Sequence, residues 1–360
     1  MYPTKKLWEI VKISKWKKVN YQDENWKYNY IDIWILRTWK VEQFTNDEWV
    51  FCKKEDILIA WDGSKSWTVW FWLEWVIGST LAKLEIQEKE IFSKFLWVFL
   101  KSKFIYLNTN TSWAAIPHLR KDILQNLPIP LPPLSTQKLI VEKLDMIFAE
   151  IEKSKNLLEK NLQNVDEMNK GLLFSLYKFP KISIWDVAEK IFAGWDLPKN
   201  WNFSKEKTEK YNIPIIANAI KDDGLYGYTD EAKVTEKAIT ISARWTIWFT
   251  KLRENPFYPI VRLLVLIPDE KKVLWKYLEY IFKTINFKQF GSSIPQLSVP
   301  QLKNFQIPLP PLSEQQKIVE YLDNIFAENQ KLKNLYQAQI KNLNEMKQSF
   351  LKKAFAGELV

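Results

Sequence analysis

The chain repeats itself at a distance of 178 residues. Residues 129–150 and 307–328 are identical at 17 of 22 positions, and both begin with IPLPPLS. The same offset relates WTVWF at 67–71 to WTIWF at 245–249. A chain that carries one pattern twice is expected to fold as two copies of one structural unit. Its 360 residues suffice for two domains of ordinary size.

Each repeat ends in a segment with coiled-coil spacing. From Ile140, apolar side chains fill 8 of 11 positions taken in alternating steps of four and three, and from Ile318 they again fill 8 of 11. This spacing predicts two long helices that pack together along an apolar seam. The alternative is that each amphipathic helix packs only on its own domain.

A proline-rich hinge precedes each predicted helix. Proline at this point prevents the helix from extending backwards, and the serine that follows is a predicted N-cap. Ser313 also begins a capping box with Gln316, whereas Lys138 leaves the first copy's box incomplete. The predicted hinge and helix-start residues are Pro132, Pro133, Ser135, Pro310, Pro311 and Ser313.

The regions before the hinges combine short strands with helices. Strands are expected at 57–60, 67–71, 237–241 and 263–267, and helices at 88–103 and 271–288. We therefore expect the α+β class, with mixed α/β regions at 1–127 and 179–306. The hinge-and-helix segments occupy 128–178 and 307–360.

Charge and composition limit the possible functions. The net charge is +10, and nine of these ten charges lie in residues 1–127 and 181–306, which favours a polyanionic partner. Scattered, solvated lysines are the alternative. Cys52 and His118 are the only cysteine and histidine, so disulfides within the chain and cysteine-based zinc sites are excluded. We expect no signal peptide and no membrane span.

Catalytic motifs are missing from the sequence. Asn255-Pro-Phe-Tyr258 lacks the second proline of an adenine methyltransferase motif, and no phosphate-binding loop is complete. The charged stretch Pro268–Lys272 is interpreted as a solvated turn. The chain is therefore expected not to be an enzyme by itself.

The tandem regions, each closed by a PLPPLxxQ hinge and a long helix, resemble the specificity subunit of type I restriction-modification systems. The matching residues are Leu131–Gln137, Leu309–Gln315, the helix starts at 140–145 and 318–323, and KAFAGEL at 353–359. The loop Ile241-Ser-Ala-Arg244 with Thr246-Ile247 is similar to a loop of the family's second target recognition domain.

The resemblance implies two target recognition domains, at 1–127 and 179–306, that read a bipartite double-stranded DNA target. It implies that the helices pack antiparallel, as a spacer and as a platform for two methyltransferase subunits, with restriction/translocase subunits as further partners. S-adenosylmethionine, ATP and Mg²⁺ would belong to those partners, and the complex would be cytoplasmic. A coiled-coil scaffold with two protein-binding heads is the alternative function.

Basic residues near the repeated loops are the candidates for DNA contact. Arginine is the usual bidentate reader of guanine, and lysine or arginine neutralises phosphates. Arg244 is equally compatible with a structural ion pair that holds its loop. The candidates are Lys65, Arg244, Lys251, Arg253 and Arg262.

Tryptophan and glycine contents are abnormal. The chain has 19 Trp and only 8 Gly, together 27 of 360 residues, a fraction close to ordinary glycine usage of about 7%. The family's loop has glycines where this chain has Trp245 and Trp248, and Trp113 matches Gly291 in the repeat. This excess of tryptophan and shortage of glycine would arise if UGA codons encode glycine in the source organism but the printed sequence reads them as tryptophan. Tryptophans that stack on bases are the alternative. Trp67 and Trp70, in the first copy of the repeated loop, are further positions at which the native residue is expected to be glycine.

Overall fold

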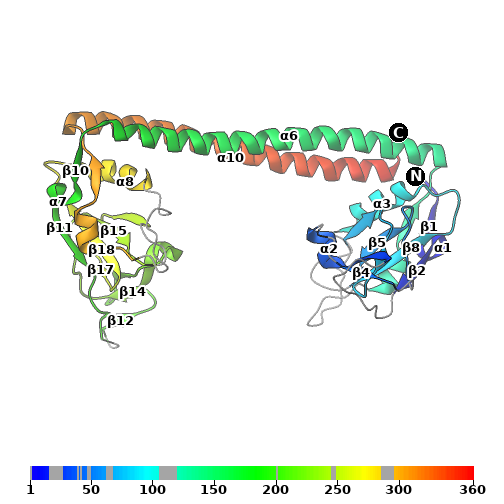
Figure 1. Ribbon diagram of the computed structural model, residues 1–360, viewed down its shortest axis with the longest axis horizontal. Coiled ribbons are helices and arrows are strands. Elements are labelled where there is room, and N and C mark those ends of the chain that lie inside the picture. The colour runs from blue at the N-terminus through cyan, green and yellow to red at the C-terminus, as the bar shows by residue number, and fades with distance from the viewer. Residues whose placement is uncertain are drawn as a thin grey trace. The chain divides into compact units, whose positions relative to one another are not determined.

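Two copies of one sheet-and-helix arrangement make up the protein (Figure 1). The computed structural model describes residues 2–15, 27–38, 40, 43–46, 50–61, 68–104, 120–199, 202–244, 249–284 and 296–360. Contacts divide the chain into one unit of Met1–Leu158 with Gln337–Val360 and a second unit of Glu159–Tyr336. The long helices α6 (Leu134–Phe174) and α10 (Leu312–Ala356) contribute residues to both units.

The first unit contains an antiparallel sheet in the order β2-β8-β5-β6. Its strands are β2 (Val11–Lys15), β8 (Leu81–Ile86), β5 (Ile57–Ala60) and β6 (Val69–Phe71). A smaller sheet joins β4 (Phe44–Thr45), β3 (Tyr28–Ile31) and β7 (Val76–Ile77), with β3 and β7 parallel. The short helices are α1 (Leu7–Ile10), α2 (Ile33–Thr38), α3 (Ser93–Ser102) and α5 (Lys121–Gln125). All four residues of β5 are buried, because this strand is covered on both faces.

The second unit repeats the order of the main sheet, and its smaller sheet has one more described strand than that of the first unit. Its main sheet has the order β11-β18-β15-β16, formed by β11 (Ala188–Ala193), β18 (Leu263–Pro268), β15 (Ala238–Ser242) and β16 (Thr250–Arg253). The smaller sheet joins β12 (Phe203–Ser204), β14 (Leu225–Thr229), β13 (Ile213–Ile216) and β17 (Tyr258–Pro259), with β13 and β17 parallel. Its short helices are α7 (Ile184–Val187), α8 (Trp275–Thr284) and α9 (Val299–Lys303). The predicted α+β class and tandem repeat are therefore confirmed.

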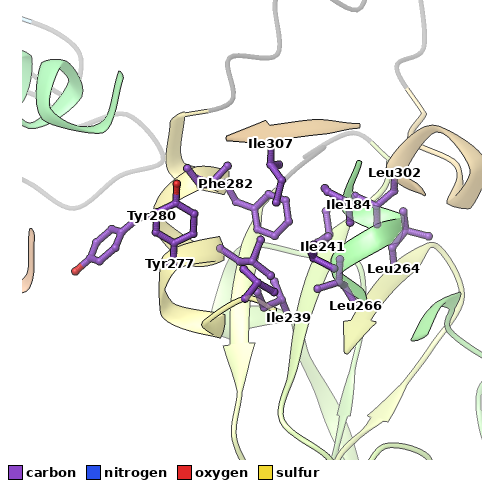
Figure 2. Packing of buried hydrophobic residues seen from close by; sticks show 14 of the residues in the cluster. Ile184, Ile239, Ile241, Leu264, Leu266, Tyr277, Tyr280, Phe282, Leu302 and Ile307 are labelled. Atoms are coloured by element: carbon purple, nitrogen blue, oxygen red, sulfur yellow. The ribbon is translucent and has the colours of Figure 1, made fainter. Parts of the chain in front are cut away.

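The core of the second unit lies between its main sheet and its short helices. Figure 2 shows Ile239 and Ile241 of β15 beside Leu264 and Leu266 of β18, with Tyr277 of α8 nearby. Each of these side chains is almost completely removed from solvent. Burial of such side chains contributes on the order of 1.5–3 kcal/mol each, so this sheet is a firm support for the loops at its ends.

The connection from β5 to β6 and the connection from β15 to β16 differ in length. In β5 and β6, Ile59 faces Val69, and in β15 and β16, Ile241 faces Thr250. If Ile59 and Ile241 are equivalent, then so are their partners Val69 of β6 and Thr250 of β16. These two partners are 181 positions apart, whereas the sequence repeat has an offset of 178. The WTxWF match at an offset of 178 thus places β6 on a segment that precedes β16 in the chain.

Each unit brings its first strand next to its hinge. In the first unit β1 (Thr4–Lys6) pairs antiparallel with β9 (Pro128–Pro130). In the second unit β10 (Lys181–Ser183) pairs in the same way with β19 (Gln306–Pro308). The IPLPPL segment is therefore a short strand followed by a helix start, and the chain enters and leaves each sheet-containing region at one place.

The helices pack antiparallel within each unit. In the second unit Lys333 pairs with Asp166 at 2.8 Å, and the Asn329 amide donates to Asn169 at 2.6 Å. Residue numbers therefore rise along α6 while those of their partners fall along α10, which is the mark of an antiparallel pair. In the first unit the Lys347 ammonium lies 4.9 Å from the centre of the Phe148 ring. A coiled-coil seam with polar residues is confirmed, and the hydrogen-bonded asparagines fix its register.

Two of the predicted seam positions, one on each helix, are displaced by one residue. Val165 is buried as expected, but Met168 and Met346, both predicted in the seam, are largely exposed. Their neighbours Asn169 and Lys347 take the seam positions instead. The error arises because a polar side chain can lie in a seam when it finds a partner there, as Asn169 does in Asn329 and Lys347 does in the Phe148 ring, and a count of apolar residues does not register this.

The predicted serine N-caps are wrong by two positions. The helices begin at Leu134 and Leu312, so Ser135 and Ser313 are second helical residues. Pro133 accepts the first helical hydrogen bond, from the Gln137 N–H at 3.0 Å, and Pro311 does the same for Gln315 at 2.9 Å. Proline is tolerated at this place because the residue precedes the helix, where its missing N–H leaves no helical hydrogen bond unmade.

Candidate nucleic-acid interface

Asn218 holds the backbone of the loop that contains Arg244. Its Oδ1 accepts hydrogen bonds from the N–H groups of Ala243 at 2.6 Å and Arg244 at 3.3 Å, and its Nδ2 donates to the Arg244 carbonyl at 2.7 Å. Arg244 also forms an isolated antiparallel bridge with Gln296. One amide side chain thus fixes the loop directly after β15, where a rigid sheet end can present it.

Arg262 lies beside this loop. The Ala243 N–H donates to the Arg262 carbonyl at 3.2 Å, which places the two arginines at the same end of β15. Arg262 is exposed and has φ 71°, in the left-handed region that costs a residue with a side chain on the order of 1–2 kcal/mol. Such strain is found at functional sites when the surrounding structure enforces it.

Lys251 and Arg253 form a second group, further along β16. Lys251 makes an ion pair of 2.9 Å with Asp223, and this hydrogen bond lowers the pKa of the Asp223 carboxyl. The Arg253 Nε donates to Thr240 Oγ1 at 3.2 Å, and its guanidinium also donates to the Asp223 carbonyl. Both cations are therefore attached to the turn Lys221–Gly224.

That turn has an unusual backbone. Asp222, Asp223 and Gly224 all have positive φ, of 50°, 54° and 81°. A Cβ on Gly224 would lie 2.6 Å from the Ala217 carbonyl oxygen, so only glycine fits there. Aspartate tolerates this region better than most residues, so Asp223 can hold Lys251 with its carboxylate and Arg253 with its backbone carbonyl.

An open cleft of about 1430 Å³ lies along this turn and β16. Among its charged lining residues, Lys207, Lys251 and Arg253 are balanced by Glu209, Asp222 and Glu254. The charges that line the cleft therefore cancel, and the cleft is polar without a net basic character.

The structure thus separates the sequence-predicted contacts into two groups. Arg244 and Arg262 lie together at the end of β15, while Lys251 and Arg253 lie on β16 with the acidic turn. Lys65 falls outside the described residues. Sequence reasoning missed Asn218, which only the tertiary fold brings to Arg244.

Comparison with known proteins identifies the family. The model of the type I restriction modification DNA specificity domain matches residues 2–160 and again residues 180–342. The chain belongs to this family. It is 32% identical over 278 residues to the type I specificity subunit S.MpnORF89P of Mycoplasma pneumoniae, covering 69% of this chain and 78% of that protein.

More distant relatives agree over a greater length. The specificity subunit of the type I restriction enzyme MjaVIII from Methanocaldococcus jannaschii is 25% identical over 88% of this chain and 86% of its own. A chain from a structure of the type I R-M system matches with a TM-score of 0.83 at 18% identity, covering 99% of this chain and 98% of that one. The chain is a DNA sequence-specificity subunit of a type I restriction-modification system, as its sequence resemblance implied.

Cys52, the NPFY stretch and the charged stretch after Pro268 have structural contacts in this specificity subunit. Cys52 is fully buried, and desolvation raises the pKa of its thiol to about 11, so it is not a nucleophile at neutral pH. Phe257 of the NPFY stretch is buried and exchanges backbone hydrogen bonds with Val234. Asp269 pairs with Lys272 at 3.3 Å in a surface turn, as expected.

The described part of the chain contains neither a metal-binding cluster of side chains nor a helix that could cross a membrane. In those residues, no group of three or more His, Cys, Asp or Glu side chains could hold a metal ion. Across the same residues, no helix combines the length and the apolar character that a membrane crossing needs. His118 lies outside the described ranges.

One described tryptophan has a backbone conformation that suits glycine. Trp72 has φ 70° and is 63% exposed. Of the ten described tryptophans, five are largely exposed, although this residue type is usually well buried. The exposed five are Trp8, Trp34, Trp72, Trp185 and Trp195. Trp70 lies on β6, whereas Trp67, Trp113, Trp245 and Trp248 fall outside the described residues.

Proposed function

We propose that each recognition region of this specificity subunit reads one half of a bipartite double-stranded DNA target. The observation that carries this proposal is the repetition of one sheet topology, hinge strand and helix start in both units. Two equivalent binding regions on one chain fit a target made of two separate parts. The scaffold with protein-binding heads is not favoured, because both regions match a DNA specificity domain.

In the second region, we propose that Arg244 and Arg262 contact one part of the half-site and that the β16 cations contact another. Support comes from the firmly held backbone at Ala243 and from the cleft beside β16. Lys251 would exchange its ion pair with Asp223 for a DNA phosphate, an exchange of one exposed charge partner for another.

The chain is proposed to lack catalytic activity and to direct partner subunits to the DNA. Methyltransferase subunits, two of them, and restriction/translocase subunits would supply the chemistry in the cytoplasm. S-adenosylmethionine, ATP and Mg²⁺ would bind those partners. This division of labour is supported by the sequence, which lacks a methyltransferase motif and a complete phosphate-binding loop.

Binding of the full chain to a pool of random-sequence DNA duplexes tests this function. Sequencing of the bound fraction should give a motif with two conserved blocks and an unspecified gap. The logarithm of the affinity should fall linearly with the logarithm of salt concentration, because lysines and arginines release counterions from phosphates. Absence of an enriched motif together with salt-insensitive binding would favour the protein scaffold.

A further inference from the structure

A buried glutamine joins each recognition region to its long helix. Gln137, in the first turn of α6, is 1% exposed. Its Nε2 donates to the carbonyls of Pro132 and Glu90, both at 2.9 Å. Its Oε1 accepts from the Phe92 N–H at 2.9 Å. One side chain thus binds the helix, the hinge and the segment that leads into α3.

Gln315 makes the same three contacts in the second unit. It is 0% exposed, and its Nε2 donates to Pro310 at 2.8 Å and to Lys272 at 3.0 Å. Its Oε1 accepts from the Leu274 N–H at 2.9 Å. The repetition of this arrangement at both sites excludes a chance packing of one side chain.

An ion pair two turns further along each helix braces the same connection. Lys94 of α3 pairs with Asp145 of α6 at 2.5 Å. In the second unit Lys276 of α8 pairs with Asp323 of α10 at 2.5 Å, and the Tyr280 hydroxyl also donates to that carboxylate. The glutamine and the carboxylate lie eight residues apart, about 12 Å along the helix, so together they fix an orientation as well as a position.

We propose that these two sites, the glutamine joints, are positioning elements that set the gap between the half-sites. The first joint comprises Gln137 and Asp145 with their partners, and the second comprises Gln315 and Asp323 with theirs. The inference rests on the proposed reading of a bipartite target. A helical spacer can define a gap only if each recognition region is held rigidly on its helix.

The chemistry of the joint explains why the residue is glutamine. A primary amide can donate two hydrogen bonds and accept others, and here two carbonyls and one N–H face it. Glutamate could accept from Phe92 but would meet two carbonyls with a negative charge. Leucine has a similar size but would leave all three backbone groups without this partner, which loosens the connection.

The test compares the full chain with a variant carrying Gln137→Leu and Gln315→Leu. Both are allowed to bind a pool of random-sequence duplexes, and the bound DNA is sequenced. A stiff joint should penalise a gap that is wrong by one base pair about as much as one mismatched base pair, roughly tenfold. The variant should keep both half-site sequences, while its preference for the parent gap falls by about this factor. This preference is a ratio between DNAs, so a smaller folded fraction does not alter it.

Gln316→Leu is the matched control. Gln316 is the adjacent residue on α10, but it is exposed and its amide bonds Glu320 of the same helix at 2.9 Å. This control should retain the parent gap preference. If the double glutamine variant does not fold, the variant with Lys94→Met and Lys276→Met removes the two partly exposed ion pairs instead, and it should broaden the gap preference too.

The possible outcomes distinguish failure of the proposed DNA recognition from failure of the positioning role of the glutamine joints. Failure of the unmodified chain to enrich any two-part motif would refute the proposed function. A two-part motif with an unchanged gap preference in the folded joint variants would overturn the positioning role alone. Changed half-site sequences in those variants would also overturn it, because the joint would then shape the base-reading surface.

Discussion

Replacing Trp72 by glycine should leave the first unit as stable as before, although removal of a tryptophan normally costs several kcal/mol. Three effects nearly cancel. Relief of the left-handed backbone gains about 1–2 kcal/mol. The greater freedom of glycine in the unfolded chain costs about 0.4–1 kcal/mol. Loss of the tilted contact with Phe71, at 5.7 Å between ring centres, costs about 0.5 kcal/mol. The expected net change therefore lies between a loss of about 0.5 kcal/mol and a gain of about 1 kcal/mol.

Trp97→Gly is the contrasting substitution. The Trp97 Nε1 donates to the Val69 carbonyl at 3.3 Å, and its ring stacks on Phe71 at 5.9 Å. It lies inside α3, where glycine adds about 1 kcal/mol to the loss of the side chain. Because the ring is only partly buried, its removal costs somewhat less than the 3–5 kcal/mol of a core aromatic. The total expected loss is about 3 kcal/mol.

Hydrogen exchange of the β5 and β6 amides, followed by mass spectrometry, measures both changes in the first unit. This local measurement is needed because a chain with two units does not unfold as one two-state system. If Trp72→Gly lost as much stability as Trp97→Gly, the backbone argument would be refuted. Mass spectrometry of peptides from the native protein addresses the codon question directly. Glycine is expected at position 72 and tryptophan at position 97, and tryptophan at 245 and 248 would contradict the reassignment.

Three further predictions concern recognition, spacing and Cys52. Exchange of residues 1–127 for the equivalent region of another family member should change one half of the DNA motif; a change in both halves would contradict independent reading. Insertion of seven residues after Lys160 and seven after Gln337 adds about 10 Å to the paired helices and should lengthen the gap without altering either half-site; an unchanged gap in an active complex would show that the helices do not set it. Iodoacetamide should alkylate Cys52 slowly at pH 8 in the folded chain and rapidly after denaturation, and rapid labelling of the folded chain would contradict the burial of this thiol. The first unit should also lose stability between about pH 9 and pH 11, because the thiol ionises at a lower pH in the unfolded chain than in the folded chain.

Periodicity and repetition predicted the long helices and the two-copy fold, because both depend on local patterns that survive in the sequence. The helix start did not follow from local rules. Ser135 has the right chemistry for a cap, but Pro133 accepts the first helical bond and Gln137 reaches back to the hinge. Pro133, two residues before Ser135, therefore occupies the N-cap position that was predicted for the serine.

Long-range pairings limited the prediction of the interface. Arg244 and Arg262 could be selected as basic residues, but their proximity depends on the pairing of β15 with β18. Asn218 carries no charge and lies in a loop, so no pattern marks it as the anchor of Arg244. Likewise, the partners of Gln137 are backbone groups, which leave no trace in side-chain chemistry.

The division of the chain has a consequence for its synthesis on the ribosome. The second unit is one continuous stretch, but the first needs Gln337–Val360 to be complete. Phe355 packs on Phe95 and Phe99, at ring distances of 5.4 and 4.9 Å. At roughly 5–20 residues per second, the 178 residues from Glu159 to Tyr336 take about 10–40 s to emerge. The region made first is therefore finished last, and a premature stop near the C-terminus would damage the N-terminal recognition region while sparing the second.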